Sequence, residues 1–268
     1  MKKIDNMEAH WTSDSQSFKN IDKEGLALVC YVGMPIWFNK FMDFFQRKTF
    51  QYLISDISLE SKHILDIGTG VGRWVQEFSQ YTSHITGIDI EKHRLTETQK
   101  KFPQSTFIHT SAEELPFEDE TFDIINTITV LQHMPYKEKE MAIKEIGRVI
   151  KKGGYVTFIE LIDINDKAKH VFPLSMQKWI QAFEEQGFRV KKKIGYEYIL
   201  ILRLLRKIQG IVKGSTVIKK EQGDVKLSPL EWLILRIVII LSYPLEWLSV
   251  KILPISTSRH AGILFEKI

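Results

Sequence analysis

Short apolar runs alternate with longer amphipathic stretches through the middle of the chain. The runs are rich in Ile, Val, Phe and Thr, which is typical of strands that pack inside a sheet. We predict strands at 63–68, 84–90, 105–110, 122–130, 154–161 and 188–195, and helices at 73–80, 92–101, 137–150 and 175–186. Strands that alternate with helices indicate an α/β fold with a mostly parallel sheet and helices on both faces.

The two ends of the chain follow other patterns. Residues 1–59 are helical in pattern and rich in aromatic side chains. Residues 198–214 predict a basic helix, and a polar linker and an apolar stretch from Leu230 follow it. The closing HAGILFEKI predicts a last strand. We therefore expect four parts, which are a helical region at 1–59, a core at 60–196, a helical insertion at 197–257 and a final strand at 258–268.

Composition narrows the class of protein. The 268 residues are 44% hydrophobic and 26% charged, which is typical of a globular protein with a sizeable core. The single cysteine, Cys30, excludes an internal disulfide and fits a reducing compartment. The opening MKKIDNMEAHW lacks the apolar run of a secretory signal, so we expect a cytoplasmic protein. The net charge of +4 is too small to indicate nucleic acid as a partner.

Three glycines follow the first predicted strand in ILDIGTGVGRW, at 64–74. Glycine weakens regular structure, so Gly68, Gly70 and Gly72 indicate a tight turn or a close approach to a ligand. Asp89 ends the next strand, where an acid can accept hydrogen bonds from a ribose. The dinucleotide fingerprint needs a third glycine where Arg73 stands, which argues against a nicotinamide or flavin cofactor.

The order D-x-G-x-G-x-G resembles motif I of the class I S-adenosylmethionine-dependent methyltransferases. Two further segments agree with this resemblance. SAEELPFEDETFDIINTITVLQHMP at 111–135 resembles the adenine loop and fourth strand of the family, and EIGRVIKKGGYVTFIE at 145–160 resembles its helix, glycine turn and fifth strand. The resemblance covers 60–195. It implies a Rossmann-like seven-stranded sheet, an N-terminal helical lid, an insertion before the last strand, and S-adenosylmethionine as cofactor.

The resemblance also implies which residues contact the cofactor. The glycines would border its methionine part, Asp66 its amino group and Asp89 its ribose. The full set of implied cofactor contacts is Asp66, Gly68, Thr69, Gly70, Gly72, Asp89, Ile90, Ser111, Ala112, Glu113 and Thr127. Ser111 departs from the family, in which an aspartate is common, and a serine hydroxyl is a weaker acceptor for the adenine amino group.

Two residues are candidates for proton transfer. His133 follows the fourth strand, where open α/β sheets bind ligands, and an imidazole can take a proton from an acceptor hydroxyl. The alternative is a histidine that only caps the loop before Pro135. Glu160, at the end of the fifth strand, could act as the base or orient His133, or could be merely solvated like Asp163 and Asp166. An oxygen-ligand metal site from Asp163, Asn165 and Asp166 is conceivable, but we expect no metal.

The lid and the insertion are candidates for acceptor recognition. Tyr31 and Trp37 are predicted to close over the site. For Phe41, Phe44 and Phe45 we favour a place in the core. Residues 198–253 predict either a hairpin packed on the core or a surface that contacts membrane or a lipid-linked substrate. The apolar run at 230–241 is broken by Glu231 and Arg236 and falls short of a membrane span.

These features together favour transfer of a methyl group to a small-molecule acceptor. We expect O-methylation of a sugar, glycolipid, quinone or secondary metabolite, because His133 would then have a use. Three alternatives stay open, which are N- or C-methylation of a small molecule, methylation of RNA or protein, and a non-catalytic partner subunit that binds the cofactor. The N/D-P-P-Y/F motif of amino-methylating nucleic-acid enzymes is missing after the fourth strand, where the chain reads NTITVLQHMP.

Overall fold

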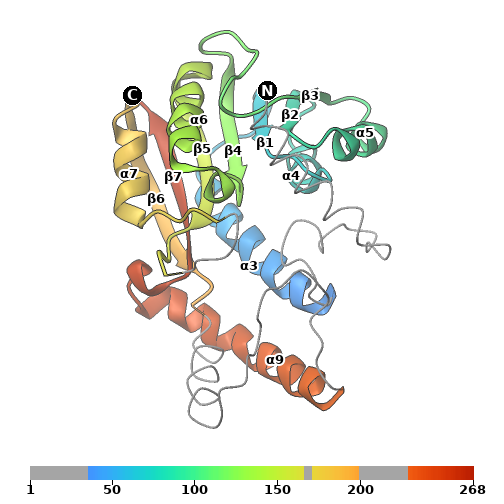
Figure 1. Cartoon of the computed structure of the whole chain (residues 1–268), viewed down its shortest axis with the longest axis vertical. Coiled ribbons are helices and arrows are strands. Elements are labelled where there is room, and N and C mark those ends of the chain that lie inside the picture. The colour runs from blue at the N-terminus through green and yellow to red at the C-terminus, as the bar shows by residue number, and fades with distance from the viewer. Residues whose placement is uncertain (1–35, 166–170, 199–228) are drawn as a thin grey trace.

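The computed structural model describes residues 36–165, 171–198 and 229–268 (Figure 1). The helices in these ranges are α3 (Ile36–Ile54), α4 (Arg73–Phe78), α5 (Lys92–Lys101), α6 (Tyr136–Val149), α7 (Met176–Glu184) and α9 (Pro229–Ile252), with short 3-10 turns η1 (Leu131–His133) and η2 (Ile255–Thr257). The strands are β1 (Ile64–Ile67), β2 (Ile85–Asp89), β3 (Thr106–His109), β4 (Phe122–Ile128), β5 (Ile150–Leu161), β6 (Phe188–Tyr196) and β7 (His260–Lys267).

Seven strands form one sheet in the order β3-β2-β1-β4-β5-β7-β6. β7 lies antiparallel between β5 and β6, and the other pairs are parallel. The predicted mostly parallel, seven-stranded α/β sheet is therefore confirmed. The chain runs outward from β1 to β3 and then returns to start β4 on the other side of β1. Ligands of such sheets bind at this reversal, beside the carboxyl ends of the strands.

Side chains of β1 alternate between two apolar layers, one on each face of the sheet. Leu65 and Ile67 pack in the layer that also holds Trp179 and Phe183 of α7. Ile64 points to the opposite layer, which contains Phe50 of α3. This alternation follows from the period of two in a strand, and it explains why the buried strands are apolar on both sides.

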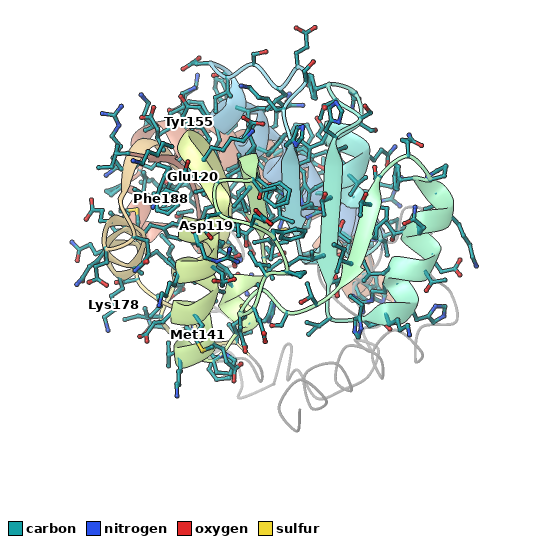
Figure 2. The ribbon with its side chains drawn as sticks, turned by 90° about the horizontal axis from the view of Figure 1, so that it is seen from above. Asp119, Glu120, Met141, Tyr155, Lys178 and Phe188 are labelled. Atoms are coloured by element: carbon teal, nitrogen blue, oxygen red, sulfur yellow. The ribbon has the colours of Figure 1, made fainter. Side chains whose placement is uncertain are left out.

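The predicted elements agree with the structure within a few residues, with one larger shift. β5 begins at Ile150, where the pattern had predicted the end of a helix and a strand only from 154. The loop that precedes β4 carries Asp119 and Glu120 (Figure 2). Tyr31, Asp166, nearly all of the predicted basic helix at 198–214 and the linker at 215–228 lie outside the described residues.

The C-terminal helix differs from our prediction. α9 continues through Pro244 as one helix of 24 residues. Its segment Trp232–Ile252 has a mean hydropathy of 1.8, and 22% of it is buried in the chain. The helix is thus long and apolar enough to cross a membrane, although we expected the stretch to fall short. The reason is that isolated charges such as Arg236 interrupt an apolar run in the sequence without ending a helix.

Candidate functional site

The three glycines after β1 all adopt the left-handed backbone conformation. The φ angles of Gly68, Gly70 and Gly72 are +70°, +53° and +79°. L-residues with a side chain rarely adopt such angles. A Cβ added to Gly68 would overlap the side chain of Val130, in the turn after β4. The glycines are therefore required by the backbone angle at all three positions, and by close packing at Gly68.

Asp89 is bound to this glycine loop from the end of β2. Its Oδ2 accepts a hydrogen bond from the backbone N–H of Gly70 at 2.8 Å, and its Oδ1 accepts one from that of Glu91 at 2.9 Å. The side chain is partly buried, and this burial raises the pKa of the carboxyl. The acid that was predicted to bind the ribose thus lies in direct contact with the loop predicted to border the methionine part.

Asp66 belongs to a buried polar network rather than to the surface. Its carboxylate accepts from the Thr69 hydroxyl at 2.8 Å and from the Asn126 side-chain amide at 2.7 Å. The Thr157 hydroxyl in turn donates to the side-chain oxygen of Asn126 at 2.6 Å. Burial raises the pKa of Asp66 to about 6. The network joins β1, β4 and β5, and contact of Asp66 with the cofactor stays a prediction.

A surface hollow lies where the resemblance had placed the adenine. It is lined by Ile90, His109, Thr110, Ser111 and Glu114, from the ends of β2 and β3. The His109 side chain connects the end of β3 to the residue that follows β2, because its Nε2 lies 2.9 Å from the Ile90 carbonyl oxygen. Ile90 and Ser111 were predicted, whereas His109, Thr110 and Glu114 were missed. Ala112 is buried at 6% exposure.

Glu160 lies at the end of β5, as predicted, and its side chain is buried and not solvated. It is fully buried, and its carboxylate accepts hydrogen bonds from the backbone N–H groups of Val130, Leu131 and Gln132 at 2.9, 3.0 and 3.1 Å. Burial raises the pKa of Glu160 to about 7. Both carboxylate oxygens are engaged by the turn after β4. These contacts do not fit a base that acts on an acceptor, and they make Glu160 a residue that holds the turn.

His133 ends this turn, and Val130 just before the turn packs against Gly68 of the glycine loop. His133 is partly buried, and its Nε2 lies 3.2 Å from the side-chain amide nitrogen of Gln132. The side-chain carbonyl oxygen of Gln132 accepts from the N–H of Leu161, which fixes the turn to the end of β5. Thr129, just before the turn, has a φ of +58°. Such an angle is strained for a β-branched residue, and strain of this kind gathers at functional sites.

The predicted Thr127 and the unpredicted Lys139 complete the surroundings of this turn. Thr127 is buried in β4, with its hydroxyl 3.4 Å from Glu160. Lys139 of α6 is 1% exposed, donates to the Phe172 carbonyl and lies 4.6 Å from the centre of the Trp179 ring. Burial lowers the pKa of Lys139 to about 8. The turn that carries His133 is thus backed by buried ionisable groups.

Arg73 connects the glycine loop to α3. Directly after Gly72, it donates to Asp43 at 2.9 Å and to the Gln46 side-chain carbonyl at 2.7 Å. Arg47 extends the network by donating to both Asp43 and Glu77. In the sequence, Arg73 served only as an argument against a dinucleotide cofactor.

The aromatic residues of α3 divide between two surroundings. Trp37 packs edge to face on Trp232 of α9, with 6.2 Å between ring centres. Phe41 and Phe45 are buried as predicted, at 2% and 7% exposure. Phe44 is 42% exposed, so its predicted place in the core is wrong. Its ring packs against Tyr243 of α9, with 5.4 Å between ring centres, at the edge of the contact between the two helices where water still reaches it.

In the part of the chain that the structure describes, no group of three His, Cys, Asp or Glu side chains could hold a metal ion.

Residues 65–158 match the protein family described as a methyltransferase domain. That segment contains the glycine loop, Asp89, the adenine-side hollow and the turn with His133. The match supports a class I S-adenosylmethionine-dependent methyltransferase domain in residues 65–158 of this chain. S-adenosylmethionine is the methyl donor of this family.

The relatives of this chain act on different acceptors, according to their names. The chain is 33% identical over 116 residues to the sterol 4-C-methyltransferase strm-1 of Caenorhabditis elegans, covering 41% of this chain and 34% of that protein. It is 28% identical over 162 residues to the ubiquinone biosynthesis O-methyltransferase of Coxiella burnetii, covering 57% of this chain and 67% of that protein. The chain thus spans only part of the curated relatives that it matches.

A solved structure supports the fold. The cyclase SpnF superposes with a TM-score of 0.54 at 17% identity, over 82% of this chain and 80% of that one. A protein that is named as a cyclase shows that this fold does not determine the reaction by itself. The argument for the reaction therefore rests on the site.

Proposed function

We propose that this methyltransferase transfers a methyl group from S-adenosylmethionine to the hydroxyl of a small molecule. The observation that carries the proposal is the hydrogen bond between Asp89 and the backbone of Gly70. It brings an acid suited to a ribose into contact with a loop suited to the methionine part. The adenine-side hollow lies on the other side of Asp89, at Ile90 and the end of β3.

The residues present fit this cofactor along its whole length. The glycine loop would hold the methionine part, since side chains are excluded there by the backbone and by Val130. Asp89 would bind the ribose, and the hollow at Ile90 and Ser111 would take the adenine. When bound, S-adenosylmethionine supplies a methyl group on a positively charged sulfur. The nucleophile takes the methyl group, and the sulfur leaves as a neutral thioether. The protein aligns the acceptor and excludes water.

His133 would accept the proton that the acceptor hydroxyl loses. An imidazole changes its charge near neutral pH, which suits it to this role. Glu160 would act through the turn, by fixing the backbone of Leu131 and Gln132 that leads to His133. The name of the Coxiella burnetii relative supports a hydroxyl acceptor such as that of a quinone. The name of the Caenorhabditis elegans relative supports a carbon acceptor as the second candidate.

Calorimetric titration with S-adenosylhomocysteine tests the cofactor site, with NAD as the control ligand. We expect the protein to bind the first compound and not the second. Asp89→Asn should weaken binding by roughly ten- to a hundredfold, since each hydrogen bond to a charged group contributes about 1.5–3 kcal/mol. Glu97→Gln, on the exposed surface of α5, is the matched control and should bind as the wild type does. Failure of the wild type to bind S-adenosylhomocysteine would overturn the proposal.

The proposed base is tested by His133→Asn. Turnover of hydroxyl acceptors should fall by about 10²-fold or more, because that is the usual contribution of general base catalysis. Affinity for S-adenosylhomocysteine should stay unchanged. His93→Asn, an exposed histidine on α5, controls for the substitution itself. Full turnover in His133→Asn would exclude His133 as the base and favour an acceptor that needs none.

A further inference from the structure

α9 differs from a helix on the surface of a water-soluble protein in the wide apolar side that it leaves exposed. Such helices bury their apolar side and expose their polar side. In α9 the buried side contains Ile239 at 2% exposure and also three polar residues, Ser242, Glu246 and Ser249, at 5%, 3% and 3% exposure. Ile240 and Leu241 on the other side are each 58% exposed. The outer side of α9 therefore needs surroundings that are themselves apolar.

The exposed apolar residues form one stripe along the whole helix. They recur at intervals of three or four positions, as one face of a helix requires. We define the apolar face of α9 as Leu230, Leu233, Ile234, Ile237, Ile240, Leu241, Leu245, Leu248 and Ile252, each of which is at least 43% exposed. The 24 residues of α9 extend about 36 Å at the usual rise per residue. Exposed patches of this length mark interaction sites.

The border of the apolar face has the chemistry of a lipid headgroup region. Arg236, Trp247 and Lys251 follow one edge of it, by their positions in the helical period. Lys251 Nζ lies 3.5 Å from the centre of the Trp247 ring, and that ring is 59% exposed. Tryptophan and lysine are the residues that anchor proteins at the membrane–water interface. The chain before α9 adds further positive charge in its sequence, with Arg203, Arg206, Lys207 and Lys213.

The contacts of the buried side do not fit a helix that crosses a membrane. Near its start, Trp232 packs on Trp37 of α3. In its middle, the Tyr243 ring lies 4.7 Å from that of Phe41. Farther along, Glu246 accepts from the N–H of Tyr198 at 2.8 Å. The helix then leads through η2 into β7, inside the sheet. A spanning helix would lose these contacts, so α9 is attached to the core along its length.

We propose that the apolar face of α9 docks on the surface of an anionic phospholipid bilayer, with the helix axis parallel to the membrane. The docking does not depend on the methyl-transfer proposal. One consequence does rest on it. α9 lies by the ends of β5 and β6, since Glu246 binds just beyond β6 and β7 begins opposite Leu161. This is the edge that carries the glycine loop, and Figure 1 shows α3 and α9 together at that end of the sheet. A docked protein would therefore receive a lipid-soluble acceptor from the bilayer.

Vesicle sedimentation with the full chain tests the docking. We expect the protein to pellet with vesicles of phosphatidylglycerol and phosphatidylcholine, and less with phosphatidylcholine alone. The double variant Ile237→Glu/Leu241→Glu should lower the partition coefficient by roughly tenfold or more, because two charges enter the apolar face. The matched control is Met141→Glu, a 44% exposed residue of α6 (Figure 2), which should pellet as the wild type does.

Titration with S-adenosylhomocysteine without vesicles checks that each variant is folded and separates this proposal from the previous one. Two results would overturn the docking, namely a wild type that stays in solution with both kinds of vesicle and a double variant that pellets unchanged. Light scattering measures the oligomeric state and tests whether a second copy of the chain, and not a membrane, covers the apolar face. A wild-type dimer that the double variant converts to monomer, with no lipid binding, would mean that a second copy covers the apolar face.

Discussion

Gly68 shows how one residue connects two loops of the site. Its φ of +70° disfavours any side chain, and the space where a Cβ would lie is filled by Val130. Val130 belongs to the turn that Glu160 holds through backbone hydrogen bonds. The packing of Gly68 against Val130 therefore couples the cofactor loop to the turn with His133.

At Gly68, the destabilisation by backbone strain and the destabilisation by overlap with Val130 can be measured separately with alanine variants. Gly153→Ala has a similar φ of +73° and nothing within 4 Å of the added Cβ, so it measures the backbone strain alone, about 1–2 kcal/mol. Gly68→Ala should lower the free energy of unfolding further, by the overlap with Val130, and should weaken binding of S-adenosylhomocysteine. Chemical denaturation measures the first effect, and calorimetry the second.

The companion variant Gly68→Ala/Val130→Ala relieves the overlap and should regain part of the lost stability. Equal unfolding free energies for Gly68→Ala and Gly153→Ala would show that Val130 yields without cost. The coupling between the two loops would then be absent.

Between elements, the ion pair of Arg73 with Asp43 fixes the position of α3 beside the glycine loop. The Arg73 and Asp43 side chains are 5% and 15% exposed, so the pair is largely removed from water. Removing one partner of a buried pair leaves the other charge without compensation. α3 and the start of α4 should therefore behave as one unit with the cofactor loop.

Arg73→Met should lower the free energy of unfolding by about 3 kcal/mol, as expected when a buried pair is broken. Arg189→Met is the matched control, because Arg189 pairs with Glu266 while 58% exposed, and exposed pairs contribute about 0–1 kcal/mol. Urea denaturation of both variants measures the difference. Similar losses in the two variants would contradict a structural role of the Arg73 pair. Binding of S-adenosylhomocysteine should also weaken in Arg73→Met alone.

For the molecule as a whole, the buried carboxyl groups make stability depend on pH. Burial raises the pKa of Asp66 to about 6 and that of Glu160 to about 7. A carboxyl with a raised pKa in the folded state binds its proton more tightly there than in the unfolded chain. Its stabilising effect is present at low pH and is lost as the pH rises through the folded pKa. Lys139, which faces Glu160, has its pKa lowered by burial to about 8 and titrates above this range.

Glu160→Gln should remove the larger of the two contributions to the pH dependence of stability, because glutamine resembles the protonated acid. We expect the unfolding free energy of the wild type to fall relative to Glu160→Gln, by on the order of 3 kcal/mol between about pH 4.5 and 7. Denaturation at several pH values measures the difference. Glu97→Gln, with its exposed carboxyl, should run parallel to the wild type through this range. A constant difference between wild type and Glu160→Gln would contradict the raised pKa.

The sequence alone determined the strands, the glycine loop and the position of Asp89. Each of these depends on local physics. Alternation of apolar residues sets the strands, the backbone angle selects glycine at 68, 70 and 72, and the acid is the last residue of a strand whose length is set by the sheet. These signals lie within a few residues of one another, so they can be read without knowing which segments meet.

Only the tertiary structure decided the partners of Glu160, Arg73 and His109, and the outward side of α9. Glu160 reads as an acid at the end of a strand, and its burial depends on a turn about thirty residues away. Arg73 reads as an exception in a motif, and its partners lie in α3. The apolar residues of α9 predict a helix, but a helical period does not state which side faces the core. That choice depends on Ser242, Glu246 and Ser249 meeting the rest of the chain, because burial is a property of contacts between distant segments.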